Sequence, residues 1–130
     1  MNEKYIIAID DEVMIADLLS GMVTRSGRRC VVFNTGIEAV NAYRNDYQNV
    51  YMVITDLSMA GMSGIDVAKE ILSINPNEAI LLITGFIKGN VQHLVKNTSV
   101  SIMDKPFSIQ ELHDKIDSMI REKEERGKVV

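Results

Sequence analysis

Short apolar runs alternate along the chain with longer segments whose apolar residues recur at helical spacing. The apolar runs are residues 5–10, 30–33, 51–56, 79–84 and 100–104. The helical segments that follow them are residues 13–25, 37–47, 65–74, 91–95 and 109–120. This alternation is typical of repeated strand–helix units around a parallel sheet. We therefore predict an α/β fold in which each of the runs forms a strand and is followed by a helix.

Two of the helical segments have a clear apolar face. In the first segment, the residues predicted to face the core are Ile15, Leu18, Leu19 and Met22. In the last segment, they are Ile109, Leu112, Ile116, Met119 and Ile120. Ser108 precedes the last segment and Glu111 follows three residues later, which is the spacing of a capping box. The fourth segment contains Gly89 and Asn90 and has few apolar residues, so we expect it to be short or mobile.

Length and composition indicate one globular domain. The chain has 130 residues, of which 46% are apolar and 25% are charged; this length suits a single core. We place the domain at residues 1–120. Residues 121–130, REKEERGKVV, have no apolar face, and we interpret them as a charged tail, a fraying end of the last helix or the start of a linker.

The charge and the apolar content exclude several classes of partner. A net charge of −4 gives no electrostatic basis for binding nucleic acid or an anionic membrane surface. No apolar stretch approaches the ~18 residues of a membrane span, and the first residues do not resemble a secretory signal. We therefore expect a cytoplasmic protein. Its single cysteine, Cys30, cannot form an internal disulfide.

Polar side chains stand where four of the apolar runs end. Asp10 and Asp11 follow the first run, Asp56 ends the third, Thr84 ends the fourth, and Lys105 comes directly after the fifth. Ligands of an open parallel sheet bind at the carboxyl ends of its strands. We therefore predict that these side chains meet at one edge of the sheet.

This combination of groups favours phosphoryl chemistry with a metal ion. Three carboxylates and one ammonium leave excess negative charge, which a hard divalent cation with oxygen ligands would balance. Mg²⁺ fits best, because it needs only one or two carboxylates and keeps waters that a phosphate can replace. A carboxylate beside Mg²⁺ and a lysine can act as a nucleophile towards phosphorus. Asp56 is the candidate nucleophile, because it stands alone on the central run, whereas the paired acids are better placed to hold a cation.

Four ordered motifs resemble the receiver domain of two-component response regulators. They are IDDE (9–12), ITDLSMAGMSGID (54–66), LLITG (81–85) and DKPF (104–107), and the resemblance covers roughly residues 4–120. It implies a doubly wound (βα)5 sheet of the flavodoxin or CheY kind with strand order 2-1-3-4-5. It also implies a switch that accepts a phosphoryl group from a histidine kinase or phosphotransfer protein and then changes a protein-binding surface. Such a domain takes up and hydrolyses the phosphoryl group itself and is not otherwise an enzyme.

The resemblance assigns a metal-binding set to this chain. It implies that Asp11 is a direct Mg²⁺ ligand and that Asp10 acts largely through water. Asp56 is implied to be both phosphoacceptor and ligand, and the backbone carbonyl of Ser58 is implied to complete the set. Glu12, which follows the acidic pair, is expected to cap the first helix or to tune the local field.

The resemblance also assigns the groups that contact the phosphoryl oxygens. Thr84 matches the switch hydroxyl that turns towards the phosphoryl group, and Lys105 matches the lysine that pairs with its oxygens. The Lys105–Pro106 bond is expected to be cis, which is a feature of X-Pro bonds.

Three positions depart from the pattern of the family or are particular to this chain. Ile102 stands where the family usually has Tyr or Phe, so signalling by rotation of that ring is in question. Ala60 replaces the usual proline of a Met-Pro pair, which we expect to loosen the loop slightly without touching the chemistry. Phe86 lies two residues after Thr84, and we hypothesise that its ring hinders the water that attacks the phosphoryl group.

Other functions remain open from the sequence. One is a receiver-like interaction module that works without phosphorylation. Another is an aspartyl-phosphate phosphatase, although such enzymes of the haloacid dehalogenase kind place a second acid where this chain has Ser58. A flavin-binding module is disfavoured, because the acidic first loop would repel a phosphate. The output target is not encoded, and a weak homodimer through the fourth and fifth helical segments is a hypothesis without a specific charge pattern.

Overall fold

The structure of the chain is a computed structural model that describes residues 3–85 and 99–128. The fourth predicted helical segment, 91–95, and Phe86 lie outside the described residues.

A five-stranded parallel sheet forms the centre of the protein. Its strands are β1 (Tyr5–Ile9), β2 (Arg29–Phe33), β3 (Val50–Asp56), β4 (Ile80–Thr84) and β5 (Val100–Asp104). Their order is β2-β1-β3-β4-β5, and every neighbouring pair is parallel. The inner strands are nearly continuous apolar runs because both of their faces are covered. The predicted strands and strand order are confirmed, and each strand boundary lies within one residue of the prediction.

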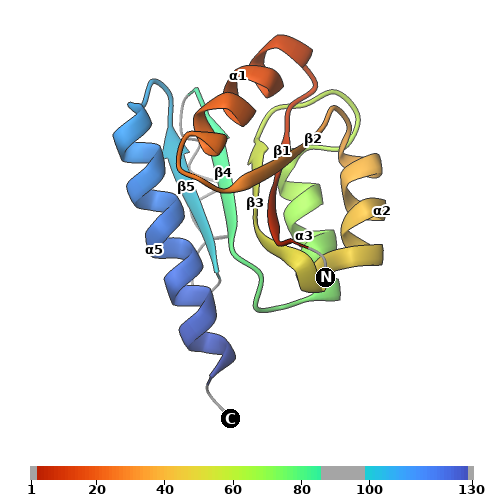
Figure 1. Cartoon of the computed structure of the whole chain (residues 1–130). Helices are drawn as coiled ribbons and strands as arrows, with labels where there is room; N and C mark the ends of the chain where they lie inside the picture. Colours follow the sequence, from red (N-terminus) through yellow and green to blue (C-terminus); the bar gives the residue numbers. More distant parts are fainter. Residues whose placement is uncertain (1–2, 86–98, 129–130) are drawn as a thin grey trace.

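Helices cover both faces of this sheet. The described helices are α1 (Val13–Thr24), α2 (Gly36–Asp46), α3 (Gly64–Ile74) and α5 (Ile109–Gly127), with a 3₁₀ turn, η1 (Tyr47–Asn49), before β3. Figure 1 shows α1 and α5 on one face and α2 and α3 on the other. The buried apolar residues accordingly form two clusters, one under each pair of helices. None of the described helices is both long and apolar enough to cross a membrane.

Side-chain caps set the start of several helices. Ser63 and Asp66 form a capping box at α3. Ser108 and Glu111 form the predicted one at α5. In each box, the serine hydroxyl accepts from a backbone N–H and the acid accepts from the N–H of the serine, so two otherwise unpaired donors are satisfied. Because these caps are local in sequence, the start of α5 could be predicted before the fold was known.

The buried face of α1 differs from the predicted one. Its buried residues are Ala16, Leu19 and Val23, whereas Leu18 is 63% exposed. Leu19 is the only predicted residue that is buried, so the face that packs on the sheet is rotated towards Ala16 and Val23. Of the other apolar residues of α1, Val13 and Met14 are exposed, and Met22 packs in part against the core cluster under α1 and α5.

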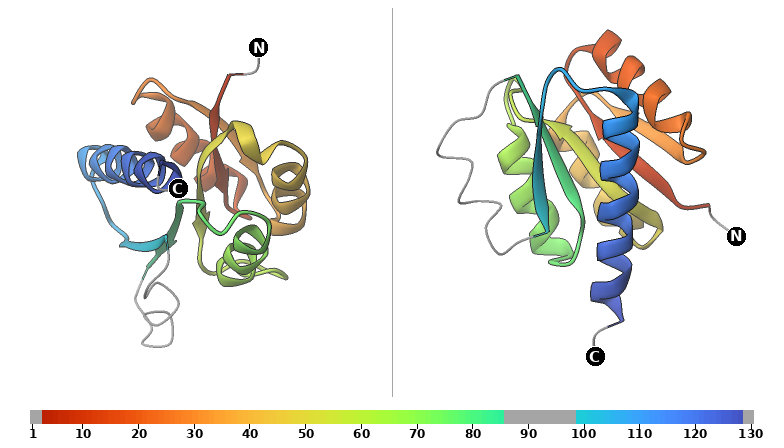
Figure 2. Two further views of the ribbon diagram at one scale, coloured as in Figure 1. Left: turned by 90° about the horizontal axis from the view of Figure 1, so that it is seen from below. Right: turned by 90° about the vertical axis from the view of Figure 1, so that its left-hand side faces the viewer.

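The last helix is longer than predicted and is tied to the sheet near its end. It continues to Gly127 and extends beyond the sheet (Figures 1 and 2). Lys123 Nζ donates to Glu78 Oε1 at 2.8 Å and to the carbonyl oxygen of Val50 at 2.7 Å. The Arg126 guanidinium donates to the side-chain and backbone oxygens of Asn77. This part of the tail is thus a helix anchored by cations, a feature that an apolar-face criterion does not detect.

Candidate functional site

The predicted site residues come from the carboxyl edge of the sheet. Asp10 follows β1, Asp56 and Thr84 end β3 and β4, and Lys105 follows β5. The strand register fixes how far along the sheet each of these side chains lies. Asp56 of β3 is paired with Ile83 of β4, and the Leu57 N–H donates to the Ile83 carbonyl at 2.8 Å. The Lys105 N–H donates to the Thr84 carbonyl at 2.8 Å. The predicted cis bond between Lys105 and Pro106 is confirmed.

Asp56 and Lys105 form an ion pair at the centre of this edge. Lys105 Nζ lies 3.4 Å from Asp56 Oδ1. The side chain of Asp56 is 15% exposed and that of Lys105 is 41% exposed, so the pair is open to an incoming group from one side. The Thr84 side chain is buried at the end of the neighbouring strand. A carboxylate with an ammonium at this distance is suited to attack an anionic phosphorus centre.

Asp10 is a buried carboxylate beside this pair. It is 4% exposed, and its Oδ1 accepts a hydrogen bond from the Glu12 N–H at 2.9 Å. Burial raises the pKa of Asp10, and the nearby charges of Asp56 and Asp11 raise it further, against the opposing effects of the Glu12 N–H and Lys105. Glu12 is the N-cap of α1 by position, which was one of its two expected roles, but its side chain makes no capping hydrogen bond.

Asn34 was missed by the sequence analysis. Its side-chain N–H donates to the backbone carbonyl of Asp10 at 3.0 Å, and the Asp10 N–H donates to the Phe33 carbonyl at 3.2 Å. These bonds fix the main chain at Asp10 against the end of β2. The only available signal was a polar residue directly after the apolar run 30–33, at the same edge as the acids.

Asp11 is exposed and is held by the loop that follows β3. Its Oδ2 accepts a hydrogen bond from the backbone N–H of Ala60 at 2.9 Å. The sequence analysis did not anticipate this contact between Ala60 and an expected metal ligand, and the expectation that Ala60 leaves the chemistry untouched stays a prediction. Ser58 lies in the same loop and is exposed.

Gly64 closes this loop against the phosphoacceptor strand. Its N–H donates to the Leu57 carbonyl at 3.0 Å. A Cβ at position 64 would lie 2.9 Å from Leu57 Cα and against the backbone carbonyl of Asp56. Only glycine permits this close approach of the backbones of α3 and β3.

The donor set suits a cation that needs few protein ligands. Among the described residues, no three His, Cys, Asp or Glu side chains are grouped closely enough to hold a metal ion as a set. Mg²⁺ needs only one or two carboxylates, with carbonyl oxygens and water for the remainder. Burial raises the pKa of Asp10, and the nearby charges of Asp56 and Asp11 add to this rise, so a cation beside these acids would be favourable. Asp10, Asp11, Asp56 and Ser58 therefore fit Mg²⁺ better than an ion that needs a full cage of side chains.

An apolar groove adjoins the carboxylates. It has a volume of about 290 Å³ and runs between α1 and the segment after β5. Asp10, Asp56 and Lys105 line its polar end. The rest is lined by Ile15, Leu18, Leu19, Met22, Ile83, Pro106 and Phe107. Ile15 and Leu18, which are not among the buried residues of α1, thus line this groove.

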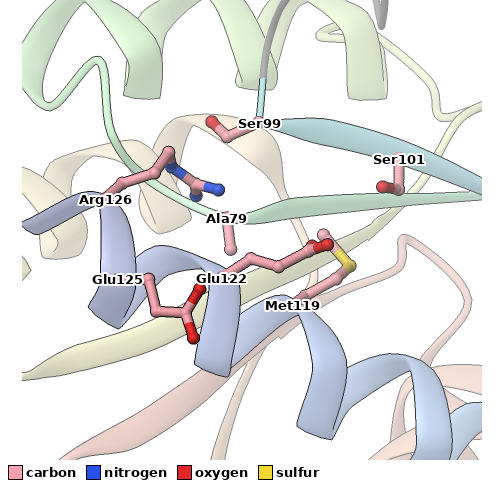
Figure 3. A pocket seen from close by; sticks show the side chains of 7 residues that line it. All are labelled: Ala79, Ser99, Ser101, Met119, Glu122, Glu125 and Arg126. Atoms are coloured by element: carbon pink, nitrogen blue, oxygen red, sulfur yellow. The ribbon is translucent and has the colours of Figure 1, made fainter.

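A second pocket, of about 450 Å³, lies at the amino ends of β4 and β5 (Figure 3). Glu122, Glu125 and Arg126 of α5 line it opposite Ser99 and Ser101. It contains none of the residues predicted to act in chemistry. The carboxyl edge therefore remains the candidate functional site.

Comparison with known proteins identifies relatives over nearly the whole chain. A family model described as the response regulator receiver domain matches residues 6–117. The chain is 25% identical to sporulation initiation phosphotransferase F of Bacillus subtilis over 119 residues, which are 89% of this chain and 92% of that protein. A solved response regulator receiver domain protein from Clostridium thermocellum aligns with a TM-score of 0.84 at 26% identity, covering 93% of this chain and 97% of that one.

Other relatives are much longer than this chain. It is 26% identical to the transcriptional regulatory protein ZraR of Klebsiella oxytoca over 108 residues, which are 82% of this chain and 24% of that protein. It spans about half the length of several other transcriptional regulators that it matches. The similarity to these proteins therefore concerns one part of them.

Proposed function

The chain belongs to the response regulator receiver domain family, and we propose that it is a phosphoacceptor switch with Asp56 as the acceptor. A carboxylate oxygen of Asp56 attacks the phosphorus of a phosphohistidine on a histidine kinase or phosphotransfer protein. The new P–O bond forms as the P–N bond breaks, and the imidazole leaves. The observation that carries this proposal is the Asp56 carboxylate at the end of the central strand, 3.4 Å from Lys105 Nζ and beside a buried acid.

The surrounding groups have complementary roles in this proposal. Lys105 neutralises charge on the transferred phosphoryl oxygens, and the Thr84 hydroxyl turns towards them after transfer. Asp11, Asp56 and the Ser58 carbonyl would hold Mg²⁺, with Asp10 acting through water. When bound, Mg²⁺ would stabilise negative charge on the phosphoryl group. The change at Thr84 and the neighbouring loops then alters a protein-binding surface.

The surface around Asp56 favours a protein donor over a small ester. The exposed fractions are 58% for Val13, 84% for Met14 and 63% for Leu18, all on α1. The apolar groove that includes Leu18 ends at Asp56. Exposed apolar side chains beside a reactive group are typical of a protein contact. A phosphatase for small esters would instead need a more enclosed substrate pocket.

Ile102 limits the ways in which phosphorylation can change the surface of the protein. Ile102 is partly buried and packs against the core cluster under α2 and α3. An aliphatic side chain there has no ring that could rotate between inner and outer positions. We therefore infer that this chain transmits its state through the loops around Thr84 and Ala60 and not through an aromatic side chain on β5.

Mass spectrometry of the intact protein tests the proposal. The protein is incubated with acetyl phosphate, with and without Mg²⁺, as wild type, Asp56→Asn and Asp17→Asn, the last altering an exposed acid of α1 as a control. We expect one phosphoryl group on wild type and Asp17→Asn, only with Mg²⁺, and none on Asp56→Asn. No uptake by wild type would favour an interaction module that works unmodified, and steady release of phosphate from small esters would favour a phosphatase.

A further inference from the structure

A single main-chain hydrogen bond joins the acidic pair to the loop after β3. The Ala60 N–H donates to Asp11 Oδ2 at 2.9 Å, although the two residues are 49 positions apart in the sequence. Both residues are exposed, so burial does not force the contact. The position of the loop must therefore hold the donor in place.

The loop has a fixed base and a defined turn. The Gly64 N–H donates to the Leu57 carbonyl at 3.0 Å, which closes the loop at its two ends. The capping box of Ser63 at the start of α3 anchors its second half. Gly61 follows Ala60 with a φ of 75°, a left-handed conformation that favours glycine. These features direct the Ala60 N–H towards the end of β1.

We propose that the Ala60 N–H is a positioning group for Mg²⁺ binding, because it holds Oδ2 of Asp11 and leaves Oδ1 available to the cation. This inference rests on the proposed function, in which Asp11 and the Ser58 carbonyl are ligands. Carboxylates that bind a metal ion are commonly hydrogen-bonded by outer-shell partners that orient them. Because Ser58 is two residues before Ala60, one loop would both supply a ligand and orient another.

The donor depends on the identity of residue 60. A proline at this position has no N–H and could not make this bond. Any other residue provides the N–H, whatever its side chain. Mg²⁺ binding should therefore depend on the backbone N–H of residue 60 and not on its side chain.

Isothermal titration calorimetry with MgCl₂ provides the test. The proteins are wild type, Ala60→Ser, Ala60→Pro, and a protein in which Ala60 is replaced by lactic acid, so that an ester oxygen takes the place of the N–H. We expect Ala60→Ser to bind Mg²⁺ like wild type. The ester protein and Ala60→Pro should bind Mg²⁺ roughly five- to tenfold more weakly than wild type. This loss is at or below the lower end of the range for removing an outer-shell hydrogen-bond partner, because the bond to Asp11 is exposed. Thermal unfolding of each metal-free protein checks that the fold is unchanged.

The ester protein gives the decisive result, because it removes the N–H without adding the ring of proline. Equal or tighter Mg²⁺ binding by the ester protein overturns the inference and leaves the proposed function standing. Failure of wild type to bind Mg²⁺ would overturn both. A second readout is the Ala60 amide proton in ¹H–¹⁵N spectra of the wild type, which should keep a downfield shift when Mg²⁺ is added. Loss of that shift on Mg²⁺ binding would show that the bond competes with the metal and would also overturn the inference.

Discussion

Two buried carboxylates, Asp10 and Glu78, lie at opposite edges of the same sheet and differ in how their charge is balanced. Glu78 is fully buried and accepts hydrogen bonds from the Tyr43 hydroxyl at 2.7 Å and from Lys123 Nζ at 2.8 Å. Asp10 is almost as buried, but its side chain accepts a hydrogen bond from the backbone N–H of Glu12, and two further carboxylates lie nearby. Burial is the first cause of a raised pKa at both acids.

The difference lies in what the surrounding charges do. At Glu78, Lys123 and the hydrogen bonds all oppose the effect of burial, so neighbouring groups of the protein offset that effect in part. At Asp10, the Glu12 N–H and Lys105 also oppose the effect of burial, but the charges of Asp56 and Asp11 add to it, so an added cation would be favourable there. A balanced buried pair serves to anchor α5, whereas an unbalanced group of acids can serve chemistry. Burial alone therefore does not distinguish the two roles.

The largest expected effect on stability comes from removing Lys123, the cation that pairs with Glu78 just before β4. We expect Lys123→Met to lower the free energy of unfolding by about 3–5 kcal/mol at pH 7, because it leaves Glu78 buried with no cation. A raised pKa of Glu78 means that its favourable contribution is present at low pH and is lost as the pH rises through the folded-state value. The loss should therefore shrink at acidic pH. Urea unfolding at pH 7 and pH 4 measures it.

Arg121→Met is the matched control, because Arg121 is an exposed cation of the same helix. Its effect should stay within about 0.5 kcal/mol. A loss for Lys123→Met no larger than that of the control would show that the pair at Glu78 is not a structural anchor.

A substitution at the carboxyl edge tests the packing that carries the acceptor. Gly64→Ala places a methyl group against the backbone of Asp56 and Leu57, so we expect a loss of about 1–3 kcal/mol in stability. Phosphoryl uptake should also slow, because Asp56 is displaced. Gly21→Ala is the control: nothing lies within 4 Å of its added Cβ in α1, and alanine should stabilise the helix by about 0.5–1 kcal/mol. Equal stability of the two variants would contradict the close approach at Gly64.

Asp10→Asn should stabilise the metal-free protein, whereas Lys123→Met and Gly64→Ala destabilise it, and the size of its effect should be smaller. Because the pKa of Asp10 is raised, its ionisation weakens the fold as the pH rises through that value. The neutral amide should therefore raise the urea midpoint at pH 7, and the gain should vanish at acidic pH, where Asp10 is protonated. Mg²⁺ should stabilise wild type more than this variant. A lower midpoint for Asp10→Asn at pH 7 without Mg²⁺ would contradict an unbalanced charge at the carboxyl edge.

The smallest effect on stability is expected from an ion pair that involves neither Asp10 nor Glu78. Arg28 and Asp117 approach to 3.5 Å, with side chains 28% and 55% exposed. Asp117→Asn should change the free energy of unfolding by about 0.5 kcal/mol or less, because water screens the pair. A loss comparable with that of Lys123→Met would mean that burial does not set the strength of ion pairs in this protein.

The amino-acid sequence by itself determined the strands, the start of α5 and the edge at which the chemistry gathers. Apolar runs that end in Asp10, Asp56 and Thr84 must deliver these side chains to one edge once the strands are parallel. The capping box at Ser108 is equally local. The resemblance to a family added the strand order and the cis bond before Pro106.

Only the tertiary structure decided which long-range partners these residues meet. Asn34 reaches the main chain at Asp10, Ala60 donates to Asp11, and Lys123 reaches Glu78 across 45 positions. The exposure of Leu18 also depends on how much of α1 the sheet covers. Residue spacing predicts a periodic face or a cap because those depend on neighbours along the chain. A hydrogen bond between distant segments depends on where loops bring them, and no local pattern carries that information.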